Sequence, residues 1–313
     1  MTLAFLFPGQ GSQAVGMGAD LAEAFASARS VFEEVDDALK QKLSKLMREG
    51  PIEDLTLTEN AQPALMAVSM AVLRVLEQEG GLALPQRAVL VAGHSLGEYS
   101  ALAAAGALRV ADCARLLRLR GQAMQRAVPA GTGAMAALLG ADLEQARALC
   151  ADAAQGEVVE AANDNGGGQV VISGHRTAVE RAVELAKARG VKRAMLLPVS
   201  APFHCSLMAP AADAMAEALA EAALMAPAVP LIANISAAKA TDPGEIRDLL
   251  VRQVTGTVRW RESVLAAIEI GVDSFVELGA GKVLTGLVRR IAPDARAASA
   301  GTPADIEALL KAL

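Results

Sequence analysis

The sequence predicts an α/β protein in which a small domain is inserted into a larger one. Short apolar runs that fit buried strands alternate with longer stretches whose apolar residues recur at helical spacing. Between Pro129 and Pro198 the order becomes strand, helix, strand, strand, helix, strand, which is typical of a ferredoxin-like unit. We therefore expect a large α/β domain with a parallel sheet over residues 1–128 and 198–313, and a ferredoxin-like domain over residues 129–197.

The elements of the larger domain are predicted from the apolar spacing. A buried strand reads as a short continuous apolar run, and the helices are rich in alanine, leucine and methionine. The expected strands lie at 3–7, 88–92, 229–234 and 274–277. The expected helices lie at about 21–45, 62–79, 97–105, 111–127, 211–224 and 245–254.

The inserted domain has clearer boundary signals. We expect its strands at 134–139, 158–163, 170–173 and 192–197, and its helices at 143–154 and 178–189. Asp142 with Gln145, and Thr177 with Glu180, have the spacing of capping boxes at the two helix starts. Three glycines at 166–168 supply a hairpin turn between the second and third strands.

Composition excludes several classes of protein. No apolar run is long enough to cross a bilayer, and the first eight residues lack a basic leader, so we expect a cytoplasmic protein. A net charge of -6 with few aromatic residues argues against a nucleic-acid partner. Cys113, Cys150 and Cys205 are odd in number and far apart, which implies neither a disulfide framework nor a metal site.

A candidate nucleophile follows the strand at 88–92, in Gly93-His94-Ser95-Leu96-Gly97. Glycines on both sides of the serine permit the tight strand-to-helix turn of a nucleophile elbow. The N-terminus of the next helix then points free N–H groups at a developing oxyanion. This context favours Ser95 as a nucleophile over an ordinary helix-capping serine, and it makes the larger domain α/β-hydrolase-like.

A serine hydroxyl needs a base, and the chain contains three histidines. His94 adjoins the serine, so the sharp turn should aim its ring away from Ser95. His175 lies in the inserted domain, just before a predicted capping box. His204 lies on the loop by which the chain re-enters the larger domain, and it is the best candidate for the base.

The histidine has no obvious acidic partner. Asp164 and several glutamates lie between Ser95 and His204 in the sequence, but all belong to the inserted domain or its helices. A backbone or side-chain carbonyl would serve instead, because orienting the ring requires only an acceptor for its second nitrogen.

Arg120 lies in the middle of the apolar face of the helix at 111–127, between Leu116 and Met124. A guanidinium aimed inward costs several kcal/mol unless acceptors meet it. Its partner is either an internal carboxylate, such as that of Glu98, or the carboxylate of a substrate, which a planar guanidinium can bind through two hydrogen bonds.

The loop after the first strand fits a dinucleotide fingerprint, Gly-x-Gly-x-x-Ala at 9–14. The acidic residue expected about twenty positions further on should end a second strand, whereas Glu33 and Glu34 lie in a helical stretch. A tight loop of this kind can instead bring a backbone N–H beside the serine and complete an oxyanion hole.

Taken together, these motifs are similar to those of the malonyl-CoA:acyl carrier protein transacylases of bacterial fatty acid synthesis. The similarity extends over the whole chain. The motifs that carry it, in the family's order and spacing, are Phe-Pro-Gly-Gln-Gly-Ser-Gln at 7–13, Gly-His-Ser-Leu-Gly-Glu at 93–98, Arg120-Gly121, Phe203-His204, and Gln253 before Trp260.

The resemblance implies an acyltransferase that needs no cofactor. It implies that malonyl-CoA is the substrate and that the phosphopantetheine thiol of an acyl carrier protein is the acceptor. The malonyl group would be carried as an ester on Ser95, with His204 as base and the N–H groups of Gln10 and Leu96 as the oxyanion hole.

The resemblance also implies the residues that bind the substrate. Arg120 would grip the malonyl carboxylate, the Gln253 region would supply a carbonyl to His204, and Asn163 would line the site. Several family members have serine where this chain has Phe203. In related polyketide acyltransferase domains a phenylalanine there accompanies malonyl rather than methylmalonyl use.

Two other functions remain as alternatives. A thioesterase or esterase would use the same elbow with water as the acceptor, but the missing acidic residue and the inward Arg120 count against it. A non-catalytic dinucleotide-binding module would use the loop at 9–14. For the transacylase we expect a monomer that binds neither nucleic acid nor membrane.

Overall fold

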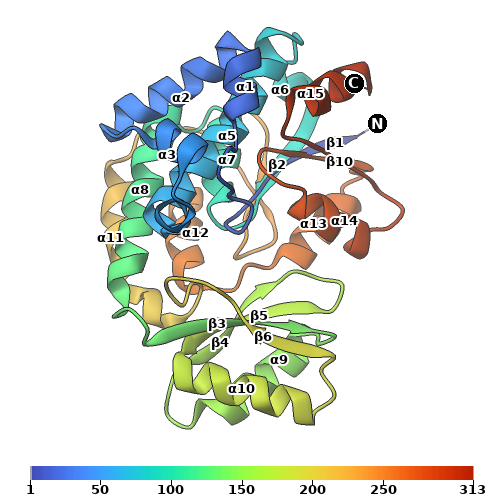
Figure 1. Cartoon of the computed structure of the whole chain (residues 1–313). Coiled ribbons are helices and arrows are strands. Elements are labelled where there is room, and N and C mark those ends of the chain that lie inside the picture. Colours follow the sequence, from blue (N-terminus) through green and yellow to red (C-terminus); the bar gives the residue numbers. More distant parts are fainter. Residues whose placement is uncertain (1, 313) are drawn as a thin grey trace.

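The computed structural model describes residues 2–312 and contains two β-sheets (Figure 1). The larger sheet has six strands in the order β10-β9-β1-β2-β7-β8, and the smaller has four in the order β4-β5-β3-β6. Neighbouring strands of the larger sheet run parallel, except that β7 and β8 are antiparallel. The smaller sheet is antiparallel throughout. The chain therefore has the α/β class predicted from its sequence, with a mixed and mainly parallel larger sheet.

Most of the helices surround the larger sheet. The larger sheet and the helices outside the 129–197 segment are β1 (Leu3–Phe7), α1 (Ala19–Ala24), α2 (Ala26–Leu39), α3 (Leu43–Glu49), α4 (Ile52–Thr56), α5 (Thr58–Gln78), α6 (Leu84–Arg87), β2 (Ala88–Gly93), α7 (Gly97–Ala104), α8 (Val110–Ala127), the 3-10 turn η1 (Ser206–Met208), α11 (Ala209–Glu221), β7 (Leu231–Ile232), β8 (Lys239–Ala240), α12 (Pro243–Thr255), α13 (Trp260–Glu269), β9 (Ser274–Leu278), α14 (Val283–Ile291), β10 (Arg296–Ala300) and α15 (Pro303–Ala312). The smaller sheet and its helices are β3 (Gly133–Leu139), α9 (Leu143–Ala154), β4 (Val159–Asp164), β5 (Gln169–His175), α10 (Arg176–Ala188) and β6 (Arg193–Leu196).

Strand β1 is buried on both faces, which explains its continuous apolar sequence. Phe5 and Phe7 pack into the main core on one side of the sheet. Leu6 packs on the other side, in a second core that includes Trp260 of α13. Because alternate residues of a strand point to opposite faces, helices on both sides require apolar residues at every position.

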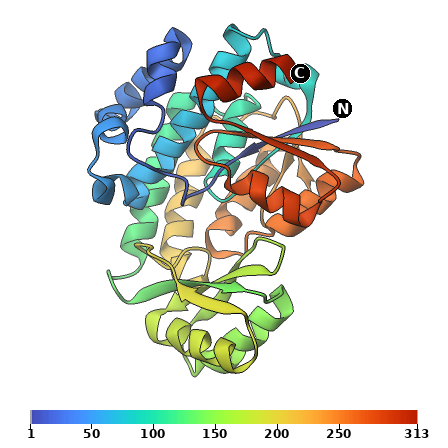
Figure 2. The ribbon, with the colours of Figure 1, turned by 45° about the vertical axis from the view of Figure 1, so that its right-hand side comes forward.

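The smaller sheet has a core of its own. Leu138 of β3, Leu149 of α9 and Val179 of α10 belong to one apolar cluster that is separate from the two clusters of the larger sheet. Figures 1 and 2 show α9 and α10 together on the face that points away from the larger sheet. The opposite face turns toward the larger sheet, where Met135 and Val171 join the main core.

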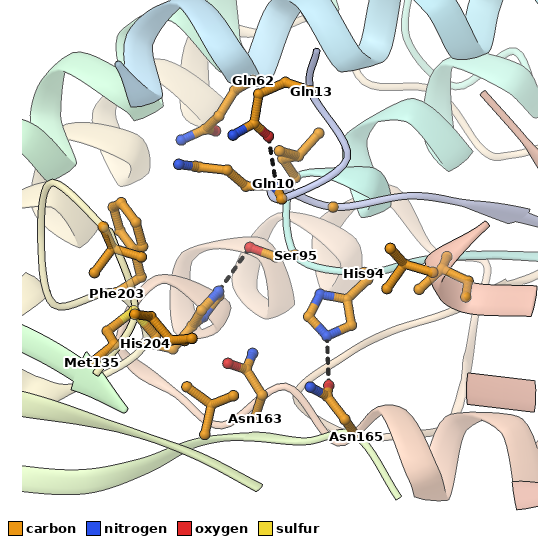
Figure 3. Close-up of a pocket in the computed structure, with 18 of the residues that line it drawn as sticks. Gln10, Gln13, Gln62, His94, Ser95, Met135, Asn163, Asn165, Phe203 and His204 are labelled. Carbon is orange, nitrogen blue, oxygen red and sulfur yellow. Dashed lines mark hydrogen bonds between the residues drawn. The ribbon is translucent and has the colours of Figure 1, made fainter. Parts of the chain in front are cut away.

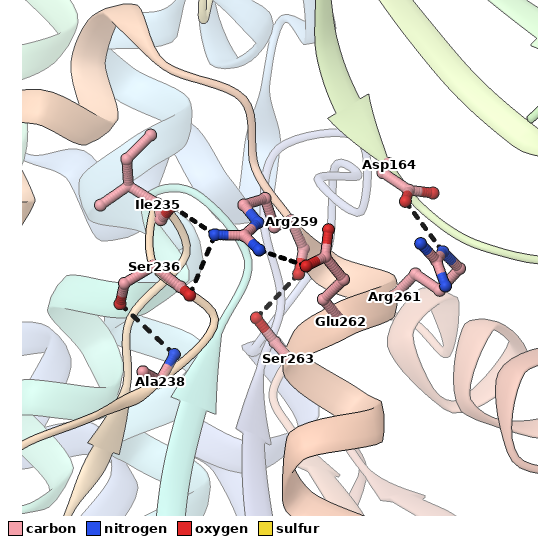
Figure 4. A network of polar contacts seen from close by, with 8 residues as sticks. All are labelled: Asp164, Ile235, Ser236, Ala238, Arg259, Arg261, Glu262 and Ser263. Atoms are coloured by element: carbon pink, nitrogen blue, oxygen red, sulfur yellow. Dashed lines mark hydrogen bonds and ion pairs between the residues drawn. The ribbon is translucent and has the colours of Figure 1, made fainter. Parts of the chain in front are cut away.

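Polar contacts fix the smaller sheet against the larger part of the chain (Figure 4). The backbone N–H of Asp164, at the end of β4, donates to the carbonyl of Val258 at 2.9 Å. The buried Asp164 side chain accepts a hydrogen bond from Nε of Arg261 at 2.9 Å. Nearby, Arg259 donates to the carbonyl of Ser236 at 3.1 Å. The end of β4 is therefore held in register with the segment that precedes α13.

Some elements differ from the sequence-based expectation. The helical stretches expected near 21–45 form three helices, which are separated by the extended Phe25 and by Lys40, whose conformation is left-handed. The strand expected at 229–234 covers only Leu231–Ile232. Helices α13, α14 and α15 and strand β10 were not expected from the sequence.

Within residues 2–312 no helix is long and apolar enough to span a membrane.

Two of the three boundary features predicted for the smaller sheet are present in the structure. Asp142 and Gln145 form the predicted capping box at the start of α9. The glycines at 166–168 connect β4 to β5, as predicted. The capping box predicted for Thr177 is wrong, because α10 begins at Arg176, two residues before the predicted start at 178. The Thr177 hydroxyl donates instead to the carboxylate of Glu157, at 2.6 Å.

Helices α5 and α8 approach closely at Gly121. A Cβ atom at this position would lie 2.5 Å from Cα of Glu59 and 2.7 Å from the carbonyl oxygen of Thr58. Both are backbone atoms, so neither can move aside without shifting α5. Gly121 therefore sets the distance between the two helices, and with it the position of its neighbour Arg120.

We predict that Gly121→Ala lowers the free energy of unfolding by about 1–3 kcal/mol, because overpacking forces the helix backbones apart. Gly286→Ala is the matched control, since a Cβ at this helical glycine meets nothing within 4 Å. That substitution should raise stability by about 0.5–1 kcal/mol. Urea unfolding of the three proteins measures both effects. Equal stability of the Gly121→Ala variant and the unmodified protein would contradict the close approach.

Candidate active site

Ser95 lies in a sharp turn between β2 and α7. Its φ is 54°, in the left-handed region that non-glycine residues rarely adopt. A Cβ at Gly93 would lie 1.9 Å from the carbonyl oxygen of Gly97, and a Cβ at Gly97 would lie 2.2 Å from that of Phe7. Both flanking glycines are therefore required by close approach of backbone. The strained turn presents the Ser95 hydroxyl at the end of the strand.

The Ser95 hydroxyl contacts the histidine predicted as its base (Figure 3). Oγ of Ser95 lies 2.7 Å from Nε2 of His204. Nδ1 of His204 lies 2.9 Å from the main-chain oxygen of Gln253. A carbonyl oxygen only accepts, so Nδ1 carries the proton and Nε2 is free to accept from Ser95. The Gln253 carbonyl thus orients the ring in the way that an acidic residue does in a triad.

Burial keeps His204 uncharged. Its pKa is lowered to about 3, mainly because burial disfavours the charged ring and also because the Arg120 guanidinium lies nearby. The ring is therefore a free base at neutral pH. The same shift affects stability: the unfolded chain binds this proton more tightly, so stability decreases as the pH falls from about 6.5 toward 3.

Arg120 meets amide oxygens rather than a carboxylate. Its side chain is 1% exposed. Nη1 donates to Oε1 of Gln62 at 2.8 Å, and Nη2 donates to Oε1 of Gln253 at 2.8 Å. Nη2 also lies 3.2 Å from Oγ of Ser95. None of the carboxylates within residues 2–312 forms an ion pair with Arg120, including that of Glu98.

The charge of Arg120 is thus desolvated without a direct ion pair, and the buried Glu98 acts on it only at longer range. Burial lowers its pKa from the ordinary value, and Nε of Arg120 has no hydrogen-bond partner. A cation in this state favours an incoming anion, and a planar guanidinium suits a carboxylate. Of the two partners considered for Arg120 from the sequence, the geometry favours a bound ligand.

Two residues that line the same cavity have backbone N–H groups that are free to bind a ligand. Gln10, in the loop after β1, and Leu96, at the start of α7, both line the cavity around Ser95. In the part of the chain that the structure describes, neither N–H donates to another group. Leu96 also has the N-terminus of α7 behind it, which adds positive potential. The pair can accept a negative oxygen that develops on a substrate carbonyl.

The cavity has a volume of about 630 Å³ and lies between the two sheets. Asn163 and Phe203, both predicted from the sequence, line it. His94 also lines it, but its ring turns from Ser95 as expected: Nε2 of His94 lies 2.9 Å from Oδ1 of Asn165. His175 lies away from this site, where its Nδ1 accepts the backbone N–H of Val158.

The chain is similar to known acyltransferases over nearly its whole length. A family model described as "Acyl transferase domain" matches residues 4–304. The malonyl CoA-acyl carrier protein transacylase of Escherichia coli K12 is 48% identical over 308 residues, which is 98% of each chain. A solved structure of an acyl-carrier-protein-S-malonyltransferase from Bartonella henselae is 58% identical, with a TM-score of 0.97 over 100% of this chain and 99% of that one.

The chain belongs to the malonyl CoA-acyl carrier protein transacylase family. A further relative of known structure is a malonyl-transacylase in complex with its type II PKS acyl-carrier protein. It is 45% identical and covers 100% of both chains, with a TM-score of 0.96. The family assignment agrees with the resemblance found in the sequence motifs.

The role of one asparagine in the site, Asn234, was not predicted from the sequence. Oδ1 of Asn234 accepts the backbone N–H of Ser95 at 2.7 Å, and Nδ2 donates to the carbonyl of Gly93 at 2.7 Å. One amide therefore braces the elbow on both sides of the nucleophile. A lone asparagine after a short strand gives no sequence signal for this role.

Sequence reasoning also missed how Gln62 and Glu98 serve the site. Gln62 supplies one of the two amide oxygens that hold Arg120. Glu98 is fully buried, and its Oε2 accepts from Nε2 of Gln253 at 2.8 Å. Burial raises the pKa of Glu98 to about 7, although the hydrogen bonds from Gln253 and Asn234 lower it. These residues lie behind the reacting groups and set their positions.

We predict that Ser95 reacts with a fluorophosphonate at a rate that stays constant from about pH 8 down to about pH 5. The reason is that a base with a pKa of about 3 is still fully deprotonated two units higher. Mass spectrometry of samples quenched over time gives the rate. If the reaction rate fell to half its value at pH 6.5, which is the ordinary pKa of histidine, the low pKa of His204 would be contradicted. Glu98→Gln is the control, because any inflection near pH 7 that it removes belongs to Glu98.

Proposed function

We propose that the protein transfers a malonyl group from malonyl-CoA to the phosphopantetheine thiol of an acyl carrier protein, through an ester on Ser95. One observation supports this most directly: a buried guanidinium without a directly paired carboxylate lies 3.2 Å from Oγ of the candidate nucleophile. The distance suits a short acyl group with a carboxylate at its far end. The relatives named above are malonyltransferases, one of them bound to its carrier protein.

In the first half of the reaction, Oγ of Ser95 attacks the thioester carbonyl while its proton moves to Nε2 of His204. The carbonyl oxygen becomes negative and is held by the N–H groups of Gln10 and Leu96. The carbon–sulfur bond then breaks, and the coenzyme A thiolate takes the proton from His204. Ser95 is left as a malonyl ester, His204 is neutral again, and coenzyme A leaves as the free thiol.

The second half reverses these steps with a different thiol. The phosphopantetheine thiol of the carrier protein gives its proton to His204 and attacks the ester carbonyl. The new carbon–sulfur bond forms as Oγ leaves and recovers the proton. Because the same groups serve both halves, the kinetics should be ping-pong, and the reaction needs no cofactor.

Arg120 is proposed to bind the malonyl carboxylate, with Gln253 holding Nη2 from behind. Asn163 and Phe203 are proposed to line the acyl and thioester path, as the sequence motifs imply. Phe203 is mostly buried and lines the cavity next to His204. As the resemblance implies for a phenylalanine at this position, a smaller acid is favoured over a branched one.

We also propose the finer division of the fold. Residues 1–128 and 198–313 would form an α/β-hydrolase-like domain, supported by the nucleophile elbow at the end of a parallel strand. Residues 129–197 would form a ferredoxin-like domain, supported by their separate core and the strand order β4-β5-β3-β6. The cytoplasmic location and the monomeric state remain predictions.

A thioesterase is disfavoured as the alternative function. It would use the same elbow with water as the acceptor, but it has no need of a buried cation beside the nucleophile. The dinucleotide-binding alternative is disfavoured as well. Glu33 and Glu34 lie in α2, so no second strand ends at an acidic residue there.

We predict that mixing the protein with malonyl-CoA adds one malonyl group, detected by intact mass and mapped to Ser95. The added mass should disappear when the acyl carrier protein in its phosphopantetheine form is supplied. Ser95→Ala should take up nothing. Label on another residue, or release to water at the same rate with and without the carrier protein, would refute the transfer.

We predict that Arg120→Ala lowers kcat/KM for malonyl-CoA by about 100-fold, as expected for the loss of a charge-assisted pair worth about 3 kcal/mol. Acetyl-CoA has no carboxylate to pair, so its turnover should fall much less. Arg115→Ala is the matched control on the same helix, because Arg115 is exposed and pairs with Asp112. An unchanged ratio of malonyl to acetyl turnover would remove Arg120 from the acyl site.

A further inference from the structure

The hydroxyl of Thr58 joins two parts of the site. Thr58 is the first residue of α5 and is fully buried. Its Oγ1 accepts a hydrogen bond from Nε2 of Gln62 at 2.9 Å and donates one to Oε1 of Gln10 at 2.9 Å. Thr58 does not cap its helix through its side chain, so this hydroxyl is not needed for starting α5. It does not line the cavity and has no contact with a substrate there.

The directions of the hydrogen bonds at Gln62 are fixed by chemistry. A guanidinium only donates, so Gln62 must present Oε1 to Nη1 of Arg120 and Nε2 to Thr58. The Thr58 oxygen accepts this bond, which leaves its hydrogen free to donate to Oε1 of Gln10. A relay of hydrogen bonds therefore runs from Arg120 through Gln62 and Thr58 to Gln10.

This contact anchors the Gln10 side chain. Its loop contains Gly9, where a Cβ would lie 2.8 Å from the carbonyl oxygen of His94, so the backbone is closely packed there, and Gly11, whose φ is 108°. The Gly11 N–H donates to Oε1 of Gln13 at 2.7 Å, on the other side of Gln10. Within residues 2–312 the Gln10 side chain makes no hydrogen bond other than the one from Thr58. The backbone N–H of the same residue is one of the two proposed oxyanion donors.

We propose that Thr58 is a positioning residue that fixes the oxyanion donor of Gln10 relative to the carboxylate-binding Arg120. The acyl pocket and the oxyanion hole are thereby held in one geometry. A malonyl thioester needs both at once, because its carboxylate and its carbonyl are joined by a single carbon. This inference rests on the proposed malonyl transfer.

The test uses Thr58→Val, which removes both hydrogen bonds at nearly constant volume. The rate of Ser95 malonylation at saturating malonyl-CoA should fall about tenfold, as expected for a misplaced donor. KM for malonyl-CoA should stay within about twofold, because the residues that contact the substrate remain. Thr58→Ser keeps the hydroxyl and should restore the rate. Ser69→Ala, which removes a buried hydroxyl without a partner from the same helix, should leave the rate unchanged.

A double-mutant cycle separates the relay from a general packing role. Gln10→Ala keeps the backbone N–H but removes the acceptor of the Thr58 hydrogen bond, so it should slow acylation to a similar extent. Thr58→Val added to Gln10→Ala should then cost nothing more. Losses that multiply in the double variant would overturn the relay, as would a normal rate for Thr58→Val.

Failure of the relay can be distinguished from failure of the proposed malonyl transfer. If the unmodified protein takes up no malonyl group, the transfer itself is refuted. If it does and the variants match it, only the relay is refuted. If Thr58→Val does not fold, Gln10→Ala alone decides, because a normal acylation rate in that variant overturns the role given to the contact.

Discussion

The site depends on one buried cation. Taking the Arg120 guanidinium out of water is costly, and the protein meets that cost with neutral amide oxygens from α5 and α12 rather than with a carboxylate. Neutral acceptors satisfy the N–H groups but leave the charge in place. The charge is then available to a ligand, whereas an internal ion pair would have cancelled it. The same choice ties together three helices, since Arg120 itself lies on α8.

The charge has opposite effects on the two proposed catalytic residues beside it. It stabilises negative charge at Oγ of Ser95, 3.2 Å away, but it also lowers the pKa of His204 and so weakens the base. A carboxylate beside the histidine would restore its basicity, yet it would also neutralise Arg120. The main-chain carbonyl of Gln253 orients the ring without adding charge. Because the histidine is oriented without an acidic residue, no carboxylate at this position competes with a ligand for Arg120.

The sequence was sufficient for features encoded locally and insufficient for those that depend on packing. Ser95 could be predicted because its strand, glycines and helix are contiguous, and Arg120 because it interrupts an apolar helix face. Gln62, Glu98 and Asn234 belong to three separate elements and have no spacing in common, so only the folded chain brings them together. Strand β10 was missed for a related reason: its sequence, Arg-Ala-Ala-Ser-Ala, lacks β-branched residues, and its pairing with β9 supplies the stability.

Backbone strain links these amides to the chemistry. Ser95 and His204 both have positive φ values, 54° and 60°, and neither is glycine. Each such conformation costs of order 1–3 kcal/mol and persists only where surrounding contacts hold it. Asn234 holds the backbone N–H of the serine, and Gln253 holds both the serine carbonyl and the histidine ring. Relaxation of either residue would turn its side chain away from the other, so the buried amides preserve the 2.7 Å contact on which the proposed proton transfer depends.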